Sequence, residues 1–374
     1  MKYCSICLTP DTRPGEKFSQ SSLCLGCLNF ATKNDINFKE RLIILKDILS
    51  KYPRKKNSYF DCVLGVSGGK DSTRQAIYLR DKLGLNPLLV SMTWPPQQLN
   101  ERGASNLSNL INLGFDLVLQ APAPITFKNL MRASFLNFAN WARSTELALY
   151  SSVPKIALDY KIQLIFNGED PGQKETQAAG VSGWDNNNII NNNTLAGGDI
   201  SWMKGIVSSN YKLEPYLYPK SGLMRKSKIQ IIDLGWFLGD WSFSKNGIYA
   251  VSHGMDPRLD GPELTGDPSY VSCLDEDWVS VNQLIKYYKF GFGKTTDFVN
   301  EEIRFGRITR TEGIKLVEMY DGACDPVLIN TFVEYIDITL EQFWNKVAQV
   351  ANKDLFNVIS PTRIVPRFKV GVGI

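Results

Sequence analysis

The sequence is poor in the groups on which several protein classes depend. A single histidine, His253, stands among 374 residues, and one imidazole cannot build a metal site by itself. No apolar run approaches the roughly 18 residues that a membrane-spanning helix needs, and the first residues do not begin a signal peptide. We therefore expect a cytoplasmic protein with reduced thiols and no membrane partner.

The chain also carries little net charge. Its formal charge is +4, and its lysines and arginines are scattered rather than clustered, which argues against nucleic acid as a partner. A hydrophobic share of 43% is ordinary for a soluble globular protein. The length suggests about two domains with appendages.

A glycine-rich turn follows the most strand-like run of the chain. Residues 60–66 are typical of a strand buried in a parallel sheet, and residues 71–83 read as a helix. The paired glycines between them would let a phosphate approach the loop amides and the helix N-terminus. This stretch supplies our candidate ATP ligands: Val66, Ser67, Gly68, Gly69, Lys70, Asp71 and Ser72.

The spacing of this turn differs from the Walker A motif and from the dinucleotide-binding motif. Ser-Gly-Gly-Lys-Asp-Ser instead resembles the pyrophosphate loop of the ATP-pyrophosphatase superfamily, whose members cleave ATP between the α and β phosphates. The alternative is a strand–helix turn that binds no ligand.

Strands and helices alternate beyond the turn. Further strands are expected at residues 87–93, 115–119 and 163–166, with helices between them, which predicts an α/β fold with a doubly wound parallel sheet. Ligands of such sheets bind at the carboxyl ends of the strands. Met92 should therefore lie beside the turn, where an adenine could sit, whereas Trp94 could serve there or simply pack.

Acidic residues follow the fourth predicted strand. Glu169 and Asp170, next to Gly168, could hold Mg²⁺ on the pyrophosphate or orient a nucleophile, or the turn could merely tolerate them. The polar residues 172–200 that follow suggest a lid, a binding loop or disorder. Trp184 in this stretch could stack on a sugar or base, or pack.

The last third of the chain is expected to be mostly helical. Helices are predicted at residues 227–234 and 278–288, a loop at 289–297, and capping boxes open helices after Thr309 and Thr339. Weak candidates for substrate contact are present, each with a structural or solvated alternative, and the histidine could also be a general acid or base. They are His253, Asp297, Arg304 and Arg307.

Four of the seven cysteines form two Cys-x-x-Cys pairs with the spacing of a zinc ribbon: Cys4, Cys7, Cys24 and Cys27. So short a segment has too little apolar material to fold unaided, so we expect structural Zn²⁺. Disulfides and a redox pair are the alternatives. We divide the chain into a zinc ribbon (1–35), a pyrophosphate-loop domain (36–240) with the polar stretch inserted, and a helical substrate or partner region (241–374).

Taken together, these segments resemble the N-acetyl sugar amidotransferase family, which makes acetamidino sugars for O-antigens and flagellin nonulosonic acids. The resemblance covers nearly the whole chain. It is carried by the opening Met-Lys-Tyr-Cys-Ser-Ile-Cys-Leu-Thr-Pro, by Val-Ser-Gly-Gly-Lys-Asp-Ser, by Gly168-Glu169-Asp170-Pro171, and by Lys-Phe-Gly-Phe-Gly-Lys-Thr-Thr-Asp with the following Arg-Phe-Gly-Arg. Two positions depart from the family pattern, Asp170 where Asn is usual and Lys294 where Arg is usual.

The resemblance implies a reaction. AMP is transferred from ATP to the oxygen of an acetamido group on a sugar or nucleotide sugar, ammonia adds to the carbon, and AMP leaves to give an acetamidine. Lys70, the loop amides and Mg²⁺ would neutralise charge at the phosphates. Asp71, Glu169 and Asp170 would hold the metal or take a proton from ammonia, and Lys294 joins them as a catalytic candidate.

A source of ammonia is missing from this sequence. A class I glutaminase needs a Gly-x-Cys-x-Gly elbow, which is absent, and an N-terminal nucleophile would need Cys where Lys2 stands. We therefore expect a separate glutaminase subunit, as the family also implies. The nearest alternative function is a tRNA-modifying enzyme of the thiolation type, which would want a catalytic cysteine pair near the loop. A non-enzymatic zinc-ribbon protein would have no use for the loop.

Overall fold

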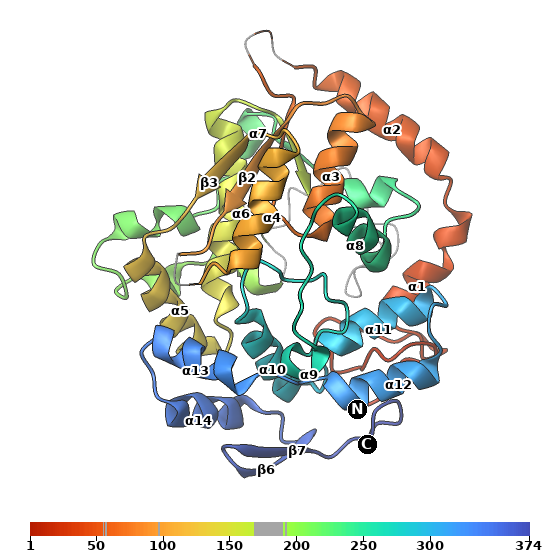
Figure 1. Ribbon diagram of the computed structural model, residues 1–374, viewed down its shortest axis with the longest axis vertical. Coiled ribbons are helices and arrows are strands. Elements are labelled where there is room, and N and C mark those ends of the chain that lie inside the picture. The colour runs from red at the N-terminus through yellow and green to blue at the C-terminus, as the bar shows by residue number, and fades with distance from the viewer. Residues whose placement is uncertain (55, 57, 96–97, 168–189, 191–192) are drawn as a thin grey trace.

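A five-stranded parallel sheet forms the upper part of the molecule (Figure 1). The computed structural model describes residues 1–54, 56, 58–95, 98–167, 190 and 193–374. The strand order is β3-β2-β1-β4-β5, and every neighbouring pair is parallel. The strands are β1 (Cys62–Gly65), β2 (Pro87–Met92), β3 (Leu117–Gln120), β4 (Leu164–Asn167) and β5 (Gln230–Asp233). The order reverses beside β1, which is where such sheets bind ligands.

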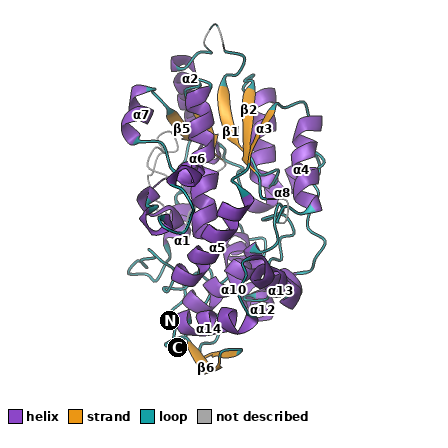
Figure 2. Cartoon of the chain, turned by 90° about the vertical axis from the view of Figure 1, so that its left-hand side faces the viewer, coloured by secondary structure: helices purple, strands orange, loops and turns teal. Residues whose placement is uncertain are grey.

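Helices cover both faces of the sheet, as the sequence predicts for a doubly wound fold. Successive residues of β1 point to opposite faces. Leu64 packs with side chains of α2 (Phe38–Lys51), α3 (Lys70–Asp81) and α4 (Glu101–Asn112), whereas Val63 packs with α6 (Ala142–Asp159) and α7 (Ser221–Lys226). Figure 2 shows α4 and α6 on opposite sides of the strands.

The lower part of the molecule is helical and holds the largest apolar core (Figure 1). The start of α6 packs there against α5 and several C-terminal helices, and an antiparallel hairpin closes the chain. The remaining elements are α1 (Leu25–Ala31), α5 (Pro124–Phe138), α8 (Phe243–Val251), α9 (Pro262–Thr265), α10 (Val279–Phe290), α11 (Lys294–Arg304), α12 (Arg310–Tyr320), α13 (Pro326–Tyr335), α14 (Leu340–Val350), β6 (Phe356–Ser360) and β7 (Arg363–Pro366), with short 3₁₀ turns between some of them.

Local signals explain several helix boundaries. Both expected capping boxes are present, at the start of α12 and of α14, where Thr309 and Thr339 each exchange hydrogen bonds with the residue three positions on. Among the described helices, none is both long and apolar enough to cross a membrane.

Two sequence predictions in the C-terminal half are wrong. Residues 227–234 do not form a helix, because residues 230–233 pair with β4 as the edge strand β5. Ile231 and Ile232 are β-branched and suit a strand. The predicted loop 289–297 is largely helical as well. Only Gly291, Phe292 and Gly293 separate α10 from α11.

Candidate active site at the phosphate loop

The turn after β1 has a geometry that only glycine satisfies. Gly68 has φ +77°, and a Cβ there would lie 2.9 Å from the backbone carbonyl carbon of Asn106 on α4. Gly69 is the N-cap of α3, and no side chain caps that helix end. The first amides of α3 are therefore available to an anion, as expected of a phosphate-binding turn.

The charged residues of the turn are held by α8. The Lys70 ammonium lies 2.6 Å from Asp71 Oδ2 and 3.8 Å from the centre of the Phe243 ring. The Asn246 side-chain amide donates to Asp71 Oδ1 at 2.6 Å, and Arg74 donates to the Asn246 oxygen at 2.5 Å. Asn246 is fully buried, so this chain of contacts fixes the carboxylate of Asp71.

A cavity of about 460 Å³ opens beside the turn. Met92 at the end of β2 and Asn167 at the end of β4 line it, as does a wall formed by residues 271–279. Its volume is in the range of small-molecule sites. The predicted ATP ligands that line this cavity are Val66, Ser67, Gly69, Lys70, Asp71, Ser72 and Met92.

Three further carboxyl groups face the same cavity, and sequence reasoning missed all three: Glu146, Asp275 and Glu276. Burial raises the pKa of Glu146 to about 7, and burial together with the Asp275 charge raises the pKa of Glu276 to about 8. Burial also raises the pKa of Asp275, although a hydrogen bond from Trp94 opposes it. The same cavity is therefore lined by these carboxyl groups and by the basic Lys70.

Trp94 lies at the edge of the large cavity and also packs against other aromatic rings. It lines the cavity, and its ring also packs edge-on against Phe127 and Trp141. Its indole N–H donates to Asp275 Oδ2 at 2.6 Å. Trp94 therefore ties the end of β2 to the wall that comes from the C-terminal third of the chain.

Lys294 is distant in sequence from the turn of residues 66–72, the phosphate loop, but lies close to it in the structure. Its ammonium is 5.4 Å from the centre of the Phe243 ring that Lys70 also contacts. Burial alone would lower the pKa of Lys294, but neighbouring Cys273, Asp267 and other acidic groups raise it overall. Lys294 lines a second, much smaller cavity, and Cys273 faces both.

The predicted substrate contacts in the C-terminal third do not line the large cavity, as far as the described residues define it. Asp297 is paired with Arg13 and with Lys286. Burial by itself would raise the pKa of Asp297, but these two cations hold that pKa well below its usual range. Arg307 pairs with Glu302 at 2.8 Å.

The remaining two candidates from the C-terminal third also lie elsewhere. His253 stacks on Tyr249, with ring centres 4.2 Å apart, and its Nδ1 lies 2.7 Å from the Tyr249 carbonyl oxygen. Arg304 ends α11, where its charge acts on Glu301. Gly168, Glu169, Asp170 and Trp184 lie outside the described residues.

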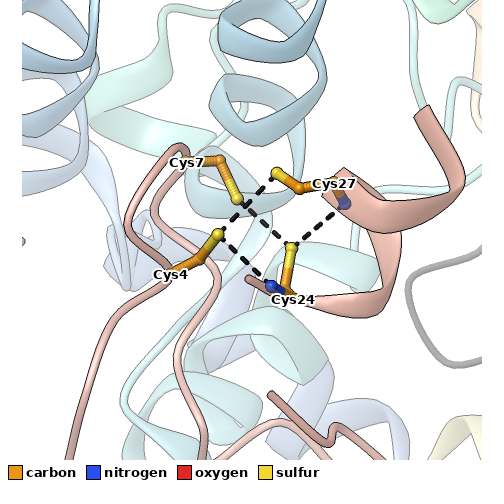
Figure 3. A group of neighbouring side chains, drawn as sticks. All are labelled: Cys4, Cys7, Cys24 and Cys27. Atoms are coloured by element: carbon orange, nitrogen blue, oxygen red, sulfur yellow. Dashed lines mark hydrogen bonds between the residues drawn. The ribbon is translucent and has the colours of Figure 1, made fainter. Parts of the chain in front are cut away.

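The four N-terminal cysteines converge on one point (Figure 3). All are buried, and their sulfur atoms lie within 4.8 Å of one another, with Cys4 3.7 Å from Cys27 and Cys7 3.6 Å from Cys24. A tetrahedral ion with metal–sulfur bonds of about 2.3 Å would separate its ligands by roughly 3.8 Å. The cluster could therefore hold a single metal ion.

The cysteine cluster is docked on α11. The Leu8 N–H donates to the Asn300 side-chain oxygen at 2.7 Å, and the Asn300 amide donates to Thr9 at 3.0 Å. The pair of Arg13 and Asp297 adds a charged contact to the same helix. Because α11 begins with Lys294, the cysteine-rich segment supports the helix that carries this lysine toward the phosphate loop.

Comparisons with known proteins give short or distant similarities. An uncharacterized protein, MJ1599 of Methanocaldococcus jannaschii, is 34% identical over 88 residues, which is 23% of this chain and 31% of that protein. The chain thus spans less than a third of the length of this curated relative.

Two solved structures are also similar. NMN synthetase from Francisella tularensis aligns with a TM-score of 0.29 and 13% identity, over 82% of this chain and 96% of that one. The U34-tRNA thiolase NcsA from Methanococcus maripaludis, solved with its [4Fe-4S] cluster, aligns with a TM-score of 0.25 and 13% identity, over 85% of this chain and 89% of that one.

One family match covers a segment that includes the cavity wall formed by residues 271–279. The matched segment begins just before the wall formed by residues 271–279 and continues through α11 to the end of β7. Residues 269–369 are similar to the family described as LPS biosynthesis protein WbpG-like, C-terminal domain.

Proposed function

We propose that this chain is an ATP-dependent amidotransferase that converts the N-acetyl group of a bacterial surface sugar into an acetamidino group. The main observation that supports this proposal is a single cavity lined by two parts of the chain. The phosphate loop forms one side of it, and residues 271–279, within the segment similar to an LPS biosynthesis family, form another.

The geometry suits activation of an amide by ATP. A secondary amide is a poor electrophile because its nitrogen donates electrons into the carbonyl. Lys70 and the free amides of α3 would bind the phosphates and favour transfer of AMP to the amide oxygen, with release of pyrophosphate. Ammonia would then add to the carbon, and AMP would leave.

Two metals belong to the proposal. Asp71 is the carboxylate of the phosphate loop that lines the cavity. Together with Glu169 and Asp170 it would hold Mg²⁺. The ion, when bound, would neutralise charge on the phosphates. Zn²⁺ is the ion we propose for the cysteine cluster, because four thiolates at the observed spacing suit one tetrahedral ion. Four protein ligands leave no open position, so its role is structural.

Ammonia would come from a separate glutaminase, and the substrate would be an N-acetylated sugar or nucleotide sugar in the cytoplasm. Thiolation of tRNA is the competing function. Of the seven cysteines, only Cys273 lines the large cavity, and Cys62 is fully buried in β1. A catalytic cysteine pair beside the loop is therefore not available, which favours the amidotransferase.

The test is a mass-spectrometric assay. Purified protein receives ATP, Mg²⁺, an ammonium salt and a panel of diacetamido sugars, free and nucleotide-linked. We expect a product lighter by the difference between an oxygen atom and an NH group, together with AMP and pyrophosphate. AMP formation that requires tRNA, with no change in any sugar, would overturn the proposal in favour of the thiolation type.

A further inference from the structure

Glu146 occupies a fixed position in the wall of the large cavity. It lies in the first turns of α6, and the next two residues, Leu147 and Ala148, are each 1% exposed in the largest apolar core. Thr145 donates to the Ala142 carbonyl oxygen at 2.9 Å within the same turn. Because its neighbours are anchored, the helix holds Glu146 toward the space that Lys70 also lines.

Glu146 differs from the other described carboxylates of this cavity in having no partner. Asp71 is held by Lys70 and Asn246, Asp275 accepts from the Trp94 indole, and Glu276 accepts from Gln98 at 3.4 Å. Within the described part of the chain, no hydrogen bond or ion pair reaches Glu146. A carboxylate with no structural partner, facing a ligand-sized cavity, is available to a reacting group.

We propose that Glu146 is the general base of the second half-reaction, the residue that takes a proton from the ammonia adduct. This inference rests on the proposed function. Ammonia forms a bond to the carbon of the O-adenylated amide, which gives a tetrahedral adduct bearing an ammonium group. Glu146 accepts one proton from that nitrogen, the carbon–oxygen bond to AMP breaks with its electron pair, and a protonated acetamidine remains.

The surroundings of Glu146 suit this task. Its pKa, raised by burial to about 7, lets it be ionised in part of the molecules at neutral pH and still accept a proton from a more acidic ammonium adduct. The titratable or charged groups lining the same cavity are Lys70, Asp71, Tyr150, Tyr218, Cys273, Asp275 and Glu276.

The experiment separates the two half-reactions. The wild type, Glu146→Gln and Glu146→Asp are compared with a control, Glu334→Gln, which removes an exposed carboxylate from α13. Exchange of labelled pyrophosphate into ATP, dependent on the sugar identified with the wild type, reports adenylation. Amidine formation from saturating ammonium salt, measured across pH 6 to 9, reports the ammonia step.

We expect Glu146→Gln to keep pyrophosphate exchange near the wild-type rate and to lose about 10²–10³-fold in amidine formation. The rise of wild-type activity through pH about 7 should disappear in that variant, and Glu146→Asp should restore part of the rate. Wild-type behaviour of Glu146→Gln, or an equal loss in both half-reactions, would overturn the inference while leaving the proposed function intact. Absence of amidine formation by the wild type itself would instead defeat the proposed function.

Discussion

The ammonium groups of Lys70 and Lys294 lie over the same aromatic ring, that of Phe243, at 3.8 Å and 5.4 Å from its centre. The two lysines begin α3 and α11 respectively, and the ring begins α8. The backbone N–H of Phe243 donates to Glu301 of α11 at 2.6 Å, which fixes the ring between these helices. One aromatic side chain thus connects the phosphate loop to α11, which lies in the segment similar to the LPS biosynthesis family.

Replacing Phe243 with leucine should therefore weaken ATP binding. A partly desolvated cation–π contact contributes about 1–2 kcal/mol, so loss of the ring should raise the KM for ATP roughly tenfold. Phe298→Leu is the matched control, because that ring packs edge-on against Phe243 and makes no such contact with any lysine among the described residues. Equal KM values in both variants would show that the ring does not position the lysines.

Lys70→Ala should abolish AMP release, because the phosphates would lose their charged partner in the loop. The variant is expected to fold, since the contacts of the Lys70 ammonium among the described residues are with a neighbouring carboxylate and an aromatic ring. AMP is measured by chromatography after incubation with ATP and the sugar, and circular dichroism verifies the fold. Full activity of this variant would contradict the assignment of the loop.

Asn246→Ala should lower both stability and activity. Asn246 is buried and bridges Arg74 and Asp71, so its removal leaves the buried guanidinium with one partner fewer and leaves the Asp71 carboxylate held by Lys70 without Asn246. We expect a loss of about 1–3 kcal/mol in the free energy of unfolding and a lower kcat for AMP formation.

Denaturant unfolding measures the free energy of unfolding, and the AMP assay described for Lys70→Ala measures the kcat for AMP formation. Asn109→Ala is the control, because Asn109 ties α4 to the His253 carbonyl at 3.0 Å without touching the loop. An activity loss no greater than that of the control would contradict a role for Asn246 in positioning Asp71.

The part of the site that sequence predicts best is local. The strand, the two glycines and the helix that follows are consecutive, so hydrophobic pattern and backbone freedom suffice to place Gly68, Lys70 and Asp71. Sequence does not identify the strand at 230–233, because four residues are too few for periodicity to distinguish a strand from a helix, although Ile231 and Ile232 favour a strand.

The part that sequence does not predict depends on distant partners. Asp297 is a substrate candidate in the sequence, and only the structure shows that it pairs with Arg13, a contact between the cysteine-rich segment and α11. Sequence does not single out Glu146, because an isolated glutamate in a helix is usually exposed to solvent. Only the partly buried position of that helix beside the loop distinguishes it. The acidic run that includes Asp275 and Glu276 was a signal that could have been used.

The purified protein should contain about one zinc ion per chain, bound by four thiolates. Cys24→Ser should lose the metal and lower the melting temperature, because Leu8, Thr9 and Asn300 connect the cysteine cluster to α11. Elemental analysis and thermal unfolding check this, with Cys324→Ser as a control outside the cluster. Iron with a visible absorption band in place of zinc would contradict the proposed ion.

Stability should also depend on pH through Glu276. Its pKa rises from an ordinary 4.5 to about 8 in the folded protein, chiefly through burial and then through Asp275. The folded state therefore holds this proton more tightly than the unfolded state. The resulting stabilisation is complete below pH 4.5 and is lost as the pH rises toward about 8. Glutamine cannot ionise, so Glu276→Gln should flatten this decline.

The measurement for Glu276 is the urea midpoint of the wild type and the variant at several pH values across that window. The midpoint of the wild type should fall more steeply than that of Glu276→Gln as the pH rises. Glu334→Gln, which changes an exposed carboxylate, should follow the wild type. Parallel curves for the wild type and Glu276→Gln would contradict the raised pKa of Glu276 in the folded protein.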